Sequence, residues 1–170
     1  MSTKLLFVIF TSAIAAALML PLAATAAPAS TSFAVVGYEY AFTQTVGSFA
    51  GTANGNAGDS AVWNATVRHD PLASTTTYVN GGSFRLLTGS LDTVTGTFVR
   101  HGGTITTLSS GPNCTNQQYR VTGQLRDVAT STTSGGSGAF AATLTHFRTR
   151  LLGRCIIYAA RVAGTVSLAY

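Results

Sequence analysis

Acidic side chains are scarce in this chain, which has five Asp and Glu residues against ten Lys and Arg residues among 170, for a formal net charge of +5. General acid–base catalysis and oxygen-ligated metal sites depend largely on carboxylates. This scarcity therefore narrows the reactions that the chain can support. Lysine occurs only as Lys4, so the rest of the chain is basic through arginine.

The sequence also lacks the short motifs that carry well-known chemistries. It contains no G-x-S-x-G, H-E-x-x-H, P-loop or calcium-loop pattern, and no His or Cys cluster with the spacing of metal ligands. The two cysteines are too far apart for C-x-x-C chemistry. We therefore predict no catalytic residue, no metal site and no cofactor, and an enzyme is the less favoured class of protein.

A long apolar run occurs near the N-terminus and is not repeated later in the chain. Lys4 precedes an apolar stretch from Leu5 to Leu20, and the small residues Ala24-Thr25-Ala26 follow. This is the pattern of a secretory signal peptide with its cleavage site, and a retained membrane anchor is the alternative. We expect removal of residues 1–26, leaving 27–170 as a single secreted, extracellular domain without a further membrane span.

Helical periodicity is absent after residue 26, and alternation with a period of two predicts nine or ten short strands instead. Glycines in mid-strand, such as Gly96, Gly123 and Gly164, indicate sharp bends or close backbone approaches. In 33–43 we expect Ala34, Val36, Tyr38, Tyr40 and Phe42 to face the core. The predicted fold is all-β, a small antiparallel β-barrel of about 8–10 strands with one disulfide, and a two-sheet β-sandwich is the alternative.

The predicted disulfide joins Cys114 and Cys155, because an exported protein with two cysteines in turn sequences favours a bridge over a metal site. The last third of the chain reads as a three-stranded meander. If Leu125 lies opposite Phe140, both cysteines fall at one end of that meander. The same register places Tyr119 opposite His146.

Three side chains with polar tips share the predicted inner face of the meander, and we predict that they bind a ligand: Tyr119, His146 and Tyr158. The alternative is that each is an ordinary semi-buried core residue. The other histidines are expected at a strand end (His69) and in a hairpin turn (His101).

Arg148, Arg150 and Arg154 cluster about the hairpin next to Cys155 and form a predicted anion-binding site. A solvated hairpin end is the alternative. Nucleic acid is an unlikely partner, because the aromatic residues that stack on bases are not interleaved with these arginines.

These patterns favour a secreted, non-enzymatic β-barrel that binds a small ligand or a component of an extracellular or cell surface. One alternative is a barrel enzyme of the cyclase or isomerase kind, with His146 as acid or base and Tyr119 or Tyr158 polarising the substrate. A structural or adhesive extracellular protein is the other. An open interior lined by polar groups would favour the ligand and enzyme hypotheses over the structural one.

Overall fold

The computed structural model describes residues 30–56, 58–72, 74–109 and 112–170, so the predicted signal peptide lies outside the described residues. The strands are β1 (Ser30–Phe42), β2 (Val46–Gly55), β3 (Ser60–His69), β4 (Thr76–Thr88), β5 (Thr93–Phe98), β6 (Thr104–Ser109), β7 (Gln117–Ala129), β8 (Gly136–Leu151) and β9 (Arg154–Ala169). One short 3-10 helix, η1 (Pro112–Cys114), precedes β7. Within these ranges no helix has the length and apolar character needed to cross a bilayer.

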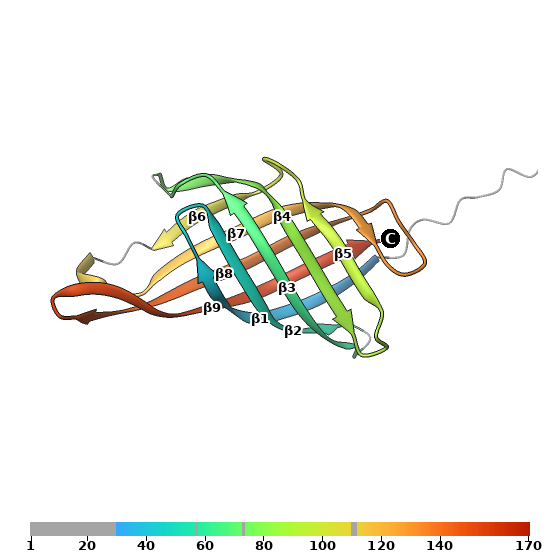
Figure 1. Ribbon diagram of the computed structural model, residues 1–170, viewed down its shortest axis with the longest axis horizontal. Coiled ribbons are helices and arrows are strands. Elements are labelled where there is room, and N and C mark those ends of the chain that lie inside the picture. Colours follow the sequence, from blue (N-terminus) through green and yellow to red (C-terminus); the bar gives the residue numbers. More distant parts are fainter. Residues whose placement is uncertain (1–29, 57, 73, 110–111) are drawn as a thin grey trace, which may run out of the picture.

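The strands form a closed antiparallel barrel (Figure 1). Neighbours in sequence pair with one another from β1 to β4 and from β7 to β9, and β9 returns to pair with β1. Strands β5 and β6 are half-length and share one position between β4 and β7, because each pairs with a different part of both neighbours. This confirms the predicted barrel over the sandwich.

Alternating residues of each strand fill the barrel interior, as the period-two pattern predicts. Trp63 on β3 is 2 % exposed, and its ring packs against Phe84 and Phe140. Its indole N–H donates to the carbonyl of Thr52 at 3.0 Å, so the buried polar atom is satisfied. These buried rings pack against one another in the barrel interior.

Two of the mid-strand glycines permit close packing, as predicted. A Cβ at Gly164 would lie 2.1 Å from the carbonyl oxygen of Ala141, and a Cβ at Gly123 would lie 2.7 Å from the ring of Phe98. Neither position can hold a larger residue without a shift of its neighbours.

The predicted register of the meander is wrong by two residues. Gly123, not Leu125, lies opposite Phe140, and Gln117 lies opposite His146. The loop between β7 and β8 is shorter than expected, and an irregularity near Asp127, which has a positive φ of 54°, precedes it. Because a two-residue slip keeps each side chain on its face, Tyr119 and His146 still point inward.

The predicted facing of β1 is also wrong. Val35 is fully buried on the inner face, whereas Val36 and Tyr38 are exposed on the outer face. Apolar residues occupy both alternating sets of this strand, so hydrophobic alternation alone could not choose between them. A bulge between Glu39 and Ala41 then shifts the pairing by one residue, which returns Phe42 to the inner side.

The disulfide between Cys114 and Cys155 is confirmed, with an S–S distance of 2.07 Å and Cα atoms 5.5 Å apart. It joins η1 to the start of β9, beside the hairpin that connects β8 and β9. Its sequence separation of 41 residues corresponds to about 4 kcal/mol of stabilisation in the chain-entropy treatment.

Candidate functional site: a polar-lined cavity at one end of the barrel

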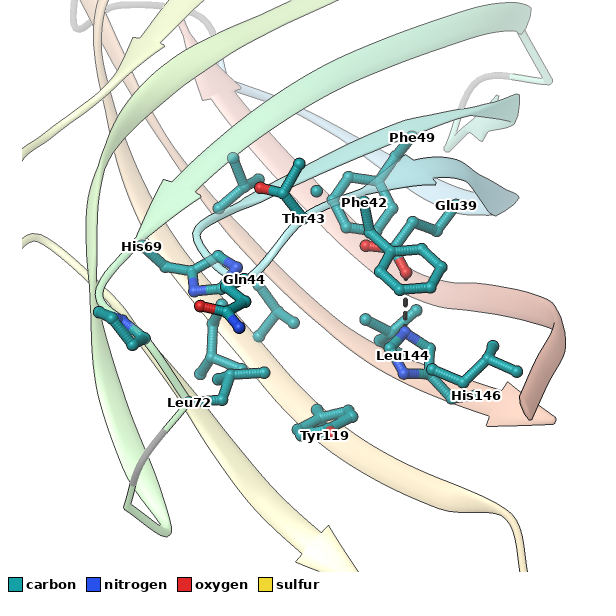
Figure 2. Close-up of a pocket in the computed structure, with 16 residues that line it drawn as sticks. Glu39, Phe42, Thr43, Gln44, Phe49, His69, Leu72, Tyr119, Leu144 and His146 are labelled. Atoms are coloured by element: carbon teal, nitrogen blue, oxygen red, sulfur yellow. Dashed lines mark hydrogen bonds and ion pairs between the residues drawn. The ribbon is translucent and has the colours of Figure 1, made fainter. Parts of the chain in front are cut away.

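A cavity of about 630 Å³ opens at the end of the barrel that carries the β1–β2, β3–β4 and β8–β9 connections (Figure 2). Its walls are largely apolar and come from most of the barrel's strands: Phe49, Val67, Ile105, Val121, Leu144 and Ile157. Four ionisable side chains join them: Glu39, His69, Tyr119 and His146. A concave apolar site with a few converging polar groups is the usual form of a small-molecule site.

Glu39 and His146 form a buried pair on one wall of this cavity. The Nε2 atom of His146 lies 2.7 Å from Oε2 of Glu39, and the two side chains are 8 % and 4 % exposed respectively. The pairing of Tyr38 with Arg161 puts Glu39 beside Ala160, which itself pairs with His146. The small Ala160 on β9 thus leaves room for side chains from β1 and β8 to meet.

The ring N–H of His146 donates to the carboxylate of Glu39, which leaves Nδ1 as the other nitrogen of the imidazole. Nδ1 is buried and has no hydrogen-bond partner among the described residues. The rings of Phe42 and Tyr119 flank the imidazole with centroids 5.7 and 5.3 Å away. The imidazole is therefore fixed by one hydrogen bond and by aromatic packing, with unused hydrogen-bonding capacity.

Tyr119 on β7 is 5 % exposed and lies edge-on to His146. Burial raises the pKa of its hydroxyl; the positive charge of Arg148 opposes this shift, and the negative charge of Glu39 adds to it. The hydroxyl therefore stays protonated at neutral pH and can both donate and accept a hydrogen bond.

His69 at the end of β3 lies on the opposite wall from His146, four strand positions around the barrel. Its Nδ1 lies 2.7 Å from the carbonyl oxygen of Asp70. A carbonyl can only accept, so Nδ1 carries the proton and Nε2 is the acceptor in the neutral ring. The cavity thus holds hydrogen-bonding groups on two facing walls.

The structure brings together two of the three residues predicted to bind a ligand. Tyr119 and His146 line the cavity, but Tyr158 is 63 % exposed on the outer surface, next to Phe147. A bulge in the β8–β9 ladder at this level shifts the pairing by one residue and turns Ile157 inward instead. The expected inward position of Tyr158 is therefore wrong.

Sequence reasoning missed Glu39 and His69 as cavity residues. The alternation expected for 33–43, with Val36 and Tyr38 facing the core, places Glu39 on the opposite, water-facing side, and the structure inverts this facing. For His69 the useful signal was present, since it continues the buried alternation of Trp63, Ala65 and Val67. The following Asp70-Pro71 ends the strand without moving His69 off the inner face.

The three arginines predicted to bind anions lie on the β8–β9 hairpin and do not line the cavity. Arg150 and Arg154 are exposed and Arg148 is half-buried. No carboxylate within the described ranges forms an ion pair with any of them. The ladder pairs Arg150 with Cys155 and Arg154 with Leu151, so Arg148 and Arg150 share one face of the hairpin and Arg154 lies on the other. Their binding of an anion stays a prediction.

No three His, Cys, Asp or Glu side chains in the described part of the chain are arranged to hold a metal ion. Comparisons of the chain with protein-family models, with curated proteins and with solved structures find no match. The geometry of the cavity and its surroundings is thus the basis for assigning a function.

Proposed function

We propose that the protein binds a small, mostly apolar molecule in the cavity at the end of the barrel. The observation that carries this proposal is an opening of about 630 Å³ whose walls are apolar but whose polar groups converge from facing strands. This volume is within the range of about 300–1,000 Å³ that is typical of small-molecule sites. The signal-like N-terminal sequence and the disulfide support secretion of this binding protein.

The polar groups favour a ligand with a hydroxyl or carbonyl group on an otherwise apolar body. Tyr119 can donate to a carbonyl, and Nε2 of His69 can accept from a hydroxyl. Such contacts would leave the apolar walls to hold the body of the ligand. A hydrocarbon without a polar group would leave these buried polar groups without partners, which weakens its binding.

The test uses N-phenyl-1-naphthylamine, a neutral probe whose fluorescence rises in apolar sites. Wild-type protein should bind it saturably. The double variant Val67→Phe/Val121→Phe fills the cavity from two walls and should lose most of this binding. Val62→Phe adds the same ring to the exposed outer face of β3 and should bind as the wild type does.

Equal binding by the cavity-filled variant and the wild type would place the probe elsewhere and refute the proposal. No saturable binding by the wild type would also refute it. The fluorescence of Trp63, which is 2 % exposed, reports whether each variant is folded.

A second candidate function, proton transfer on the bound molecule, is favoured by the buried pair of Glu39 and His146. A carboxylate that holds an imidazole in an apolar cavity is an arrangement used in general acid–base catalysis. Such a group would remove a proton from the ligand at one position and return it at another, as an isomerase does.

A generic substrate tests this candidate without knowledge of the natural one. In 5-nitrobenzisoxazole a base removes the ring C–H proton, the N–O bond breaks, and a coloured phenolate forms. The wild type should accelerate this opening over the variant Glu39→Leu/His146→Leu. Equal rates for the two proteins would rule out a catalytic base in this pair, while leaving the binding proposal intact.

A further inference from the structure

The β8–β9 hairpin continues beyond the barrel as a two-stranded projection (Figure 1). Its ladder runs without interruption from the pair Arg148–Ile157 to the pair Leu151–Arg154. The disulfide at Cys155 ties this hairpin to η1, so its orientation on the barrel is fixed. It projects from the end of the barrel where the cavity opens, and Ile157 belongs to both.

The tip of the hairpin displays apolar side chains to solvent. Leu152 is 95 % exposed and Leu151 is 56 % exposed. Leu152 and Gly153 form the turn with positive φ angles of 51° and 77°, a turn in which Asn-Gly is the usual sequence. A leucine at the first of these positions is unfavourable for both backbone and solvation, which points to a role in contact with something else.

Arginines surround this apolar tip. Arg150 and Arg154 are exposed beside it, and the three hairpin arginines have no ion-pair partner in the described ranges. Three of the five carboxylates lie at the opposite end of the barrel, in or beside its connections: Asp59, Asp92 and Asp127. The hairpin thus carries three arginines without an ion-pair partner beside its apolar tip, while most of the carboxylates lie at the other end of the barrel.

We propose that the β8–β9 hairpin docks on an anionic lipid surface, with Leu151 and Leu152 at the boundary between headgroups and acyl chains. A soluble polyanion would account for the arginines but would leave the leucines in water. A second copy of the chain would cover the leucines but would bring like charges together. A lipid surface accounts for both the arginines and the leucines, because its anionic headgroups can bind the arginines and the boundary with the acyl chains can bury the leucines.

Docking in this orientation turns the cavity end of the barrel toward the lipid surface, because Ile157 on the same hairpin lines the cavity. The docking proposal does not depend on what the cavity binds. Its test can therefore fail or succeed separately from the probe-binding test above.

The experiment measures co-sedimentation of residues 27–170 with vesicles of phosphatidylcholine containing about one quarter phosphatidylglycerol, and with pure phosphatidylcholine vesicles. Wild-type protein should bind the anionic vesicles, and binding should fall as salt rises. Arg148→Gln/Arg150→Gln/Arg154→Gln should weaken binding by about 100-fold. Leu151→Ser/Leu152→Ser should weaken it by about 10-fold or more.

Matched control variants distinguish the contribution of the hairpin from the effects of net charge and of exposed leucines elsewhere on the protein. Arg68→Gln/Arg85→Gln/Arg100→Gln removes the same net charge from elsewhere and should retain most of the binding. Leu91→Ser removes a leucine that is 80 % exposed with a φ of 64° at the opposite end, and it should bind as the wild type does. Equal loss in either control and its hairpin counterpart would refute the site.

Heparin serves as a soluble polyanion in the final comparison. If Leu151→Ser/Leu152→Ser binds vesicles as well as the wild type does, the leucines have no part in docking and the proposal fails. It fails equally if heparin binds as tightly as the anionic vesicles, or if the wild type binds no vesicles. The proposal stands only if both hairpin variants lose vesicle binding while both controls keep it.

Discussion

Removing one member of the Glu39–His146 pair should destabilise the fold more than removing both. In His146→Leu the carboxylate of Glu39 stays in a site where its side chain is 4 % exposed, without the hydrogen bond of 2.7 Å that satisfied it. Leaving a buried charged group without its hydrogen-bond partner costs more than about 3 kcal/mol. That is a large fraction of the roughly 5–15 kcal/mol that stabilises a domain.

The reverse single variant, Glu39→Leu, should cost less. It leaves an imidazole that can be neutral, so the loss is that of a buried hydrogen-bond donor, about 1–3 kcal/mol. The double variant Glu39→Leu/His146→Leu replaces the pair with apolar side chains in an apolar wall. Replacing both partners of a buried hydrogen bond with apolar groups can be nearly neutral or stabilising, so the double variant should be more stable than His146→Leu.

Urea unfolding followed by the fluorescence of Trp63 measures all four proteins. The exposed pair of Arg126 and Asp127, whose side chains are 67 % and 72 % exposed, provides a control cycle with little coupling expected. If the double variant of Glu39 and His146 is no more stable than His146→Leu, the reasoning is refuted. The carboxylate would then be stabilised by something other than the imidazole.

Three further predictions follow from the structure. Cys114→Ser/Cys155→Ser should lower the free energy of unfolding by about 4 kcal/mol in urea titrations, and an unchanged midpoint would contradict this. Burial raises the pKa of Tyr119, so the contribution of its protonated hydroxyl to fold stability is complete below the unfolded-state pKa of about 10 and is lost as pH rises through the folded-state pKa. Above pH ~10 the wild type should therefore lose more stability than Tyr119→Phe does. Equal losses in the two proteins would contradict this prediction. The intact mass of exported protein should correspond to cleavage after Ala26, and retention of residues 1–26 would disprove the signal peptide.

The fold was predictable from sequence where one alternating set of residues is clearly more apolar than the other. In β3 the buried set holds Ala61, Trp63, Ala65 and Val67, and the exposed set holds Asn64 and Arg68 among its members. In β1 both sets contain apolar side chains, so which set faces inward depends on the pairing of β1 with β9, which lies far along the chain. The facing of Glu39 was therefore settled only by the closure of β1 against β9.

The candidate site was predictable only in part, because bulges are local and have no strong sequence signal here. His146 and Tyr119 lie in the regular part of their ladder and were placed correctly on the inner face. Tyr158 lies at a bulge, where one extra residue reverses the facing that simple alternation would give. The two residues that sequence reasoning missed, Glu39 and His69, each lie within one residue of such an irregularity.

Irregular pairing and the cavity coincide at one end of the barrel for a physical reason. The β1–β2 and β8–β9 ladders slip at Tyr40 and Tyr158, and the β3–β4 ladder slips at Asn80. Each extra residue bends its strand and interrupts the inward alternation that fills the rest of the interior. The clustered rings of Trp63, Phe84 and Phe140 do not line the cavity, which lies at the level of these irregularities. Glu39 and His69 face inward by the regular alternation of their strands, and because they border these irregularities they line the cavity.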